Sequence, residues 1–189
     1  MRRPARRPEH RARDPTPPPF DQAAMRARPH PSETPATQWL RRHGVEFSLH
    51  PYDYVDRGGA AHAARQLAVD PHQVVKTLVM QDQAARPLVV LMHGDLEVST
   101  QALARQIGAK SVQPCAVEVA QRHSGYLVGG TSPFALRKPM PVHVEAGVLE
   151  LPRIYINGGR RGLLLGLAPA VLSQHLAARP VRCAAPSQP

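Results

Sequence analysis

The stretch DPHQVVKTLVM, residues 70–80, contains the clearest strand signal in the chain. It opens with a short helical turn, and the residues from Val74 to Met80 are then almost uniformly apolar, which predicts a buried strand. Lys76 interrupts this run, and strand alternation places it on one face with Leu78. An ammonium group is costly to bury, so we expect the stem of Lys76 to be packed and its head to reach a cleft or rim.

Shorter elements flank this strand on both sides. The sequence pattern predicts helices over residues 35–43, 60–67, 100–107, 116–122 and 169–176, and strands over residues 45–49, 88–92, 126–128, 142–145, 154–156 and 163–167. Several of these strands are short and joined by hairpins, without regular βαβ repeats. We therefore predict an α+β fold with a mixed, mostly antiparallel sheet curled into a partial barrel with flanking helices, in preference to a doubly wound parallel sheet.

Composition limits the possible classes of protein. The 189 residues are 42% hydrophobic, contain 21 prolines and carry a net charge of +10, half of it within residues 1–31. That Pro- and Arg-rich segment lacks apolar periodicity, so we expect it to be a disordered tail. It has no apolar signal-peptide core, and no run of about 18 apolar residues occurs anywhere, so we expect a cytoplasmic protein without a membrane segment.

Two segments could carry chemistry, and each also has a plain structural explanation. Lys76 suits phosphate binding, but it also suits a sheet edge that a charge protects from aggregation. The segment SGYLVGGTSPF, residues 124–134, places Gly129 and Gly130 after a predicted strand, where backbone amides could receive an oxyanion, with Ser132 adding a hydroxyl. The same glycines could simply form a turn.

Other catalytic signatures are missing from the sequence. No Cys or His pair has metal-ligand spacing, and Ser124 lies outside any GxSxG motif, so we predict neither a metal site nor a catalytic triad, and no cofactor. Cys115 and Cys183 are expected to be free thiols, the latter near a frayed end. Such a site would act by positioning the substrate and stabilising charge.

The chain resembles the YbaK/EbsC family of Cys-tRNA(Pro) deacylases, which is similar to the editing domain inserted in bacterial prolyl-tRNA synthetases. The resemblance rests on five ordered motifs, which are TPATQWL, HPYDY, DPHQVVKTLV, AQRHSGYLVGGTSPF and RIYINGGRRGL. It implies an aminoacyl-tRNA editing domain of that fold over residues 32–180, which leaves the tail at 1–31 and a C-terminal tail at 181–189 outside the domain.

The resemblance also implies roles for individual residues. Lys76 would hold the acceptor end of an aminoacyl-tRNA, and Gly129 and Gly130 would act with it in catalysis. Tyr52, Thr77 and Ser132 would shape the aminoacyl pocket. The substrate's own thiol would attack its ester carbonyl, giving lyase-like release. The resemblance leaves open whether prolyl-tRNA synthetase is a partner.

Two positions depart from the family pattern. Glu145 stands where an Asp is expected, and either binds the substrate's α-amine or is an exposed carboxylate at a strand end. Arg160 replaces the usual lysine of the glycine-rich turn. Alternatives to Cys-tRNA(Pro) deacylation are editing of Ala-tRNA(Pro) or another small amino acid by the same fold, and a non-catalytic module that binds tRNA or a synthetase.

Overall fold

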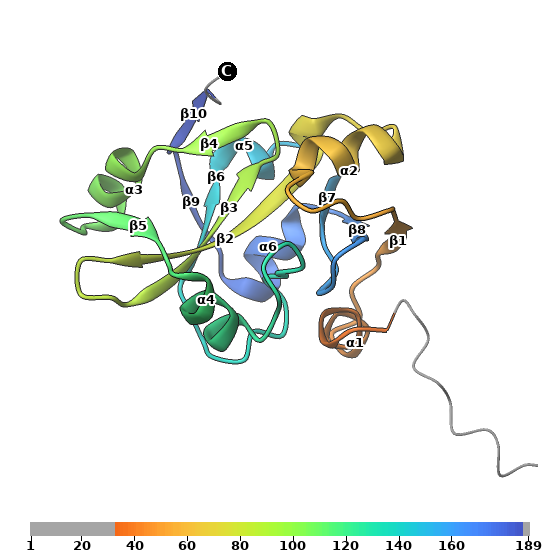
Figure 1. Cartoon of the computed structure of the whole chain (residues 1–189), viewed down its shortest axis with the longest axis horizontal. Helices are drawn as coiled ribbons and strands as arrows, with labels where there is room; N and C mark the ends of the chain where they lie inside the picture. Colours follow the sequence, from red (N-terminus) through yellow and green to blue (C-terminus); the bar gives the residue numbers. More distant parts are fainter. Residues whose placement is uncertain (1–32, 187–189) are drawn as a thin grey trace, which may run out of the picture. The chain divides into compact units, whose positions relative to one another are not determined.

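A computed structural model describes residues 33–186, which contain six α-helices and ten β-strands (Figure 1). The helices are α1 (Pro35–Arg42), α2 (Gly59–Leu67), α3 (Thr100–Ile107), α4 (Val117–Ser124), α5 (Ala146–Leu149) and α6 (Ala170–Leu176), and a 3₁₀ turn η2 covers Pro71–Gln73. The strands are β1 (Ser48–Pro51), β2 (Val74–Asp82), β3 (Pro87–His93), β4 (Leu96–Val98), β5 (Val112–Pro114), β6 (Val142–Glu145), β7 (Ile154–Asn157), β8 (Leu163–Leu167), β9 (Arg179–Val181) and β10 (Ala184–Pro186). The tail predicted at residues 1–31 lies outside the described residues.

The main sheet confirms the predicted α+β class with a mixed, mostly antiparallel sheet. Its strand order is β1-β8-β7-β2-β3-β6-β9, with β5 added beside β2 (Figure 1). The pairs β2–β7, β3–β6 and β6–β9 are parallel, and the other pairs in this sheet are antiparallel. Strands β1 and β9 end the path without pairing to each other, so the described sheet is open.

Strand β2 is central because it contributes to three apolar clusters. Its Val75 side chain packs in the largest cluster, between the sheet and α1, whereas Met80 packs in a second cluster with α3. Val74 joins a third cluster with α2. Since side chains alternate along a strand, Thr77 shares the face of Val75, and Lys76 shares the opposite face with Met80.

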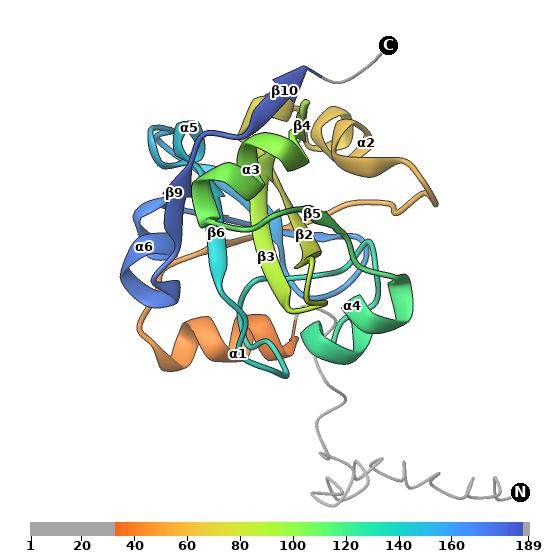
Figure 2. The same ribbon diagram turned by 90° about the vertical axis from the view of Figure 1, so that its left-hand side faces the viewer.

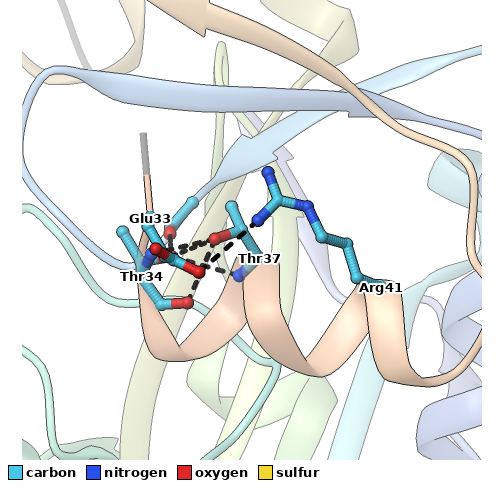
Figure 3. A network of polar contacts seen from close by, with 5 residues as sticks. Glu33, Thr34, Thr37 and Arg41 are labelled. Carbon is cyan, nitrogen blue, oxygen red and sulfur yellow. Dashed lines mark hydrogen bonds and ion pairs between the residues drawn. The ribbon is translucent and has the colours of Figure 1, made fainter. Parts of the chain in front are cut away.

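Helix α1 begins at a capping box, which Figure 3 shows. The hydroxyl of Thr34 accepts a hydrogen bond from the Thr37 amide at 3.1 Å, and the Thr37 hydroxyl accepts one from the Thr34 amide at 2.9 Å. The Thr34 hydroxyl also donates to the carbonyl oxygen of Gly158. This last bond ties the start of α1 to the turn after β7, so the cap orients a loop as well as satisfying helix amides.

The C-terminal end differs from the predicted tail at residues 181–189. Residues 184–186 form β10, which pairs antiparallel with β4 (Figure 2). Cys183 is only 1% exposed, so it is not near a frayed end. The prediction was wrong for residues 181–186 because β9 and β10 are three residues long, and each is held by pairing with a distant strand.

The predicted strand at residues 126–128 is also wrong. Gly125 ends α4 with a φ of 83°, and the chain then turns back on itself. The Tyr126 hydroxyl donates to the carbonyl of Phe134 at 2.6 Å, while Leu127 is 62% exposed. Local hydrogen bonds therefore replace a strand ladder, and the segment is a loop beside the sheet.

Candidate active site

A cavity of about 510 Å³ opens along one edge of β2. Its walls come from the loop after β1, from α2, from Cys115 and the start of α4, from the loop at residues 128–131, and from the turn after β7. Four of the predicted site residues line it, namely Tyr52, Lys76, Thr77 and Gly129. Within the described residues, Gly130, Ser132 and Glu145 are not part of this lining.

The cavity lies where β2 changes its pairing partner. On one edge, Val74 and Val75 pair with the parallel strand β7, and Met80 to Asp82 pair with the antiparallel strand β5. Neither strand pairs with the residues between, from Lys76 to Val79. This interruption leaves a short free edge in the middle of a sheet, and the cavity surrounds it.

Lys76 reaches the cavity but its head group already has a partner. Its Nζ donates to the main-chain carbonyl of Leu96. Burial lowers the pKa of Lys76, and the nearby carboxylates of Glu97 and Asp95 oppose that shift. Because an ammonium carries three donor hydrogens, this one bond leaves donors for a ligand.

Thr77 points its side chain to the other face of β2. Its Oγ1 is buried, and no hydrogen-bond partner for it is found among residues 33–186. A buried hydroxyl without a partner costs free energy, about 1–3 kcal/mol on mutational scales. Thr77 also lines the cavity, so its wall contains a buried polar group without a partner among the described residues.

The glycine loop is held from several sides. The Asn157 side-chain amide donates to the Gly129 carbonyl at 3.0 Å, and the Arg161 Nε donates to the Val128 carbonyl at the same distance. The Gly130 amide donates to the Leu127 carbonyl at 2.9 Å, so it is not the open oxyanion donor that the sequence suggested. Gly129 has a φ of 87°, a conformation that favours glycine.

Ser132 supports the loop from inside the protein. It is fully buried, and its hydroxyl accepts a weak hydrogen bond from the Phe134 amide at 3.4 Å. The cavity-lining threonine of this loop is Thr131, whose hydroxyl donates to the Leu127 carbonyl at 3.5 Å. The structure therefore does not bring the predicted serine to the cavity.

An aromatic and cationic pair forms part of the cavity wall. The guanidinium of Arg161 lies 5.0 Å from the ring centre of Tyr54, a cation–π contact, and both residues line the cavity. Tyr52 donates its amide to the Gly162 carbonyl at 3.0 Å, and burial raises the pKa of its phenol. These contacts join the loop after β1 to the turn after β7.

Sequence reasoning overlooked Arg161, Tyr54 and Asn157. The motifs HPYDY and RIYINGGRRGL contain these residues, but nothing in either motif indicated a role for them. Both arginines of the second motif's glycine-rich turn are exposed, and only Arg161 lines the cavity. The bond from Arg161 to a carbonyl 33 residues away separates the two arginines, and no local pattern contains that information.

Glu145 lies away from the cavity and is 7% exposed, so the prediction of an exposed carboxylate at a strand end is wrong. Its Oε2 accepts hydrogen bonds from the amides of Cys183 at 2.7 Å and Ala184 at 2.9 Å. These contacts connect the end of β6 to the last strands of the chain. In this structure Glu145 holds the C-terminal segment.

A second polar group lies at the turn after β3. His72, His93 and Asp95 offer ligand atoms within 4.8 Å of one another. The His72 Nδ1 lies 3.0 Å from both carboxylate oxygens of Asp95, and the His93 Nδ1 contacts the His72 carbonyl at 2.7 Å. None of the three lines the cavity along β2.

Comparison with known proteins identifies the family. Residues 57–187 match the model of the aminoacyl-tRNA editing domain, and this span includes β2, the glycine loop and the turn after β7. The chain belongs to the aminoacyl-tRNA editing family. A curated relative is EbsC of Enterococcus faecalis, named as a proposed Cys-tRNA(Pro)/Cys-tRNA(Cys) deacylase. It is 27% identical over 143 residues, which is 75% of this chain and 87% of EbsC.

Solved structures share the fold of this editing domain. The hypothetical protein APE2540 is 25% identical, with a TM-score of 0.74 over 80% of this chain and all of the other. A protein described as a proposed trans-editing enzyme for prolyl-tRNA synthetase is 20% identical, with a TM-score of 0.70 over 82% of this chain and 97% of the other. Among the described residues, none of the helices has the length and apolar character needed to cross a bilayer.

Proposed function

We propose that this editing-family protein is a trans-acting deacylase that cleaves the ester of mischarged tRNA, with Cys-tRNA(Pro) as its substrate. The observation that carries the proposal is the cavity along β2, where Lys76 and Thr77 of one family-like motif meet Gly129 of another. The name of EbsC supports the choice of amino acid and tRNA, and the name of the trans-editing structure supports action on a separate tRNA.

The reaction requires the ester carbonyl to be attacked while the ribose oxygen leaves. In hydrolysis, water adds to the carbonyl carbon, the bond to the ribose oxygen breaks, and that oxygen takes a proton, which releases the amino acid and a free ribose hydroxyl. Lys76 would bind a phosphate or ribose oxygen of the acceptor end. The cavity wall at Val128 and Gly129 would shape the space for the aminoacyl group.

The thiol of a cysteinyl substrate supplies an alternative nucleophile. Its sulfur would bond to the ester carbon as the ribose oxygen leaves with the thiol proton, giving a cyclic thioester that water then opens. Among residues 33–186, Cys115 is the only thiol that lines the cavity, and burial raises its pKa, which lowers its thiolate fraction at neutral pH. This supports assigning the nucleophile to the substrate.

The proposed binding partner is the acceptor end of tRNA, and prolyl-tRNA synthetase is a proposed second partner. Arg57, Lys76 and Arg161 at the cavity supply positive charge for the phosphates. The proposed reaction takes place in the cytoplasm, where charged tRNA is used, and needs neither a metal nor a cofactor.

Deacylation of three substrates tests the proposal. The full chain is incubated with tRNA(Pro) charged with cysteine, alanine or proline, and loss of each ester is compared with its spontaneous loss. We expect rapid loss of the cysteinyl ester only. Equal loss of the alanyl ester would favour the broader editing activity, and binding without loss of any ester would favour a non-catalytic module.

A further inference from the structure

The free edge of β2 leaves the main-chain groups of a cavity-lining residue, Thr77, without a strand partner. Along an antiparallel strand, the N–H and C=O groups of successive residues point to opposite edges. The Val79 carbonyl accepts a hydrogen bond from the Cys115 amide at 3.1 Å, so Val79 points its polar groups away from β3. Thr77, two residues earlier, points its groups to the same side.

The neighbouring strand β3 agrees with this orientation. Thr77 lies opposite Leu91, and Val79 lies opposite Val89. The Val89 amide donates to the Pro141 carbonyl at 2.8 Å, on the far side of β3, so the Val79–Val89 pair is of the non-hydrogen-bonded type. The Thr77–Leu91 pair, two residues along, is of the same type.

Neither neighbour on the other edge takes up the Thr77 groups. Pairing with β7 stops at Val75, and pairing with β5 starts at Met80. The edge therefore presents an N–H donor and a C=O acceptor side by side, and the unpartnered Thr77 hydroxyl lies on the adjoining face. An added strand would bind the main-chain N–H and C=O groups of such an edge.

An aminoacyl ester carries the matching pair of groups. Its α-ammonium is a donor, its ester carbonyl is an acceptor, and the same two bonds separate the nitrogen from the carbonyl carbon as in a strand residue. We propose that Thr77 binds the aminoacyl group as one residue of an added antiparallel strand, with its C=O accepting from the α-ammonium and its N–H donating to the ester carbonyl. This inference rests on the proposed deacylase function.

The pairing also predicts where the substrate side chain lies. Residues directly opposite each other in an antiparallel pair project their side chains to the same face. An L-aminoacyl side chain would therefore lie beside the Thr77 Oγ1, and a D side chain would project to the face of Lys76. The buried hydroxyl favours a small side chain with a polar atom on Cβ, such as the thiol of cysteine.

Hydrogen exchange of the ¹⁵N-labelled full chain tests the main-chain contact. In the free protein, we expect the Thr77 amide to exchange at least about 100-fold faster than the Leu78 amide, which points toward β3. The probe is 3′-(L-cysteinyl)amino-3′-deoxyadenosine, a stable amide analogue. Its binding should slow Thr77 exchange about tenfold or more, and the analogue without the α-amino group should bind at least about tenfold more weakly.

Two results would overturn the inference: equal protection of Thr77 and Leu78 in the free protein, or saturable binding of the probe that leaves Thr77 exchange unchanged. Failure of the probe to bind counts against it as well. Deacylation of Cys-tRNA(Pro) is measured on the same preparation. The proposed function can therefore survive while the Thr77 contact fails.

Matched variants test the side-chain contact. Thr77→Val removes the hydroxyl but keeps the shape, so the ratio of kcat/KM for Cys-tRNA(Pro) to that for Ala-tRNA(Pro) should fall about tenfold, which is the loss of one hydrogen bond of about 1.4 kcal/mol. Thr77→Ser should keep the ratio. If Thr77→Val lowered kcat/KM equally for both substrates, that result would contradict a contact with the substrate side chain.

Discussion

The Nζ of Lys76 donates a hydrogen bond to the main-chain carbonyl of Leu96, at the start of β4. This bond orients a partly buried ammonium at the cavity, with the carboxylates of Asp95 and Glu97 nearby. Lys76 is therefore held in place before any ligand binds. A group fixed in this way loses little freedom on binding, which favours its use in positioning a substrate.

Lys76→Ala should lower the rate of Cys-tRNA(Pro) deacylation by about two orders of magnitude, because the acceptor end would lose its alignment. The fold should change little, since the residue is only partly buried. Single-turnover rates and thermal melts measure the two effects. Lys138→Ala is the matched control, because Lys138 is exposed and outside the cavity. A folded Lys76→Ala protein with normal turnover would overturn the assigned site.

Gly130→Ala should separate the glycine loop from the turn after β7. A Cβ atom at this position would lie 2.8 Å from the Arg161 nitrogen and 2.9 Å from the Arg160 carbonyl carbon, and main-chain atoms cannot move aside cheaply. We expect a loss of about 1–3 kcal/mol in unfolding free energy, measured in urea, and reduced deacylation.

The control for this variant is Gly108→Ala. Gly108 has a φ of 72° but open space around its Cβ position, so the substitution introduces backbone strain without a clash. It should cost about 1 kcal/mol and leave deacylation unchanged. Similar activity losses in both variants would show that general destabilisation, not loop position, causes the effect.

Glu145→Ala should lower the unfolding free energy by about 2–3 kcal/mol, because the Cys183 and Ala184 amides would lose a charged acceptor. Glu145→Gln keeps an acceptor oxygen and should cost less. The exposed Glu150 provides a control in Glu150→Ala. If Glu145→Ala instead raised KM for Cys-tRNA(Pro) at unchanged stability, the carboxylate would bind substrate as the family resemblance implied.

The two cysteines should differ in reactivity and in structural role. Iodoacetamide should modify Cys115 in the folded protein and spare Cys183. Burial and the nearby Glu145 raise the pKa of the Cys183 thiol to about 12. Cys115→Ser should keep substantial activity, whereas Cys183→Ser should lower the melting temperature by burying a hydroxyl. Mass spectrometry and melts measure these effects. A folded but inactive Cys115→Ser protein would place the nucleophile on the protein.

A truncated protein that begins at Ser32 should deacylate normally. The composition of residues 1–31 offers little surface to bury, and α1 with its capping box starts only at Thr34 and Pro35. Rates and melts are compared with those of the full chain. Loss of activity at unchanged stability would identify the segment as an RNA-binding arm.

Elements with local signals were predictable from the sequence. Helix α3 lies between the capping residue Ser99 and Gly108, which has a φ of 72°, and its predicted range matches residue for residue. The strand from Val142 to Glu145 also matches. Caps, breakers and apolar period act over a few residues, so the sequence alone contains the information. The ordered motifs likewise identified the family.

Only the tertiary structure decided how these pieces form a site. The free edge at Thr77 exists because β7 and β5 stop at different points along β2. The separate roles of Arg161 and Arg160, and the burial of Glu145, depend on contacts more than 30 residues apart in sequence. Such contacts form when distant segments pack together, and the sequence near any one residue does not specify which main-chain groups the packing leaves unpaired.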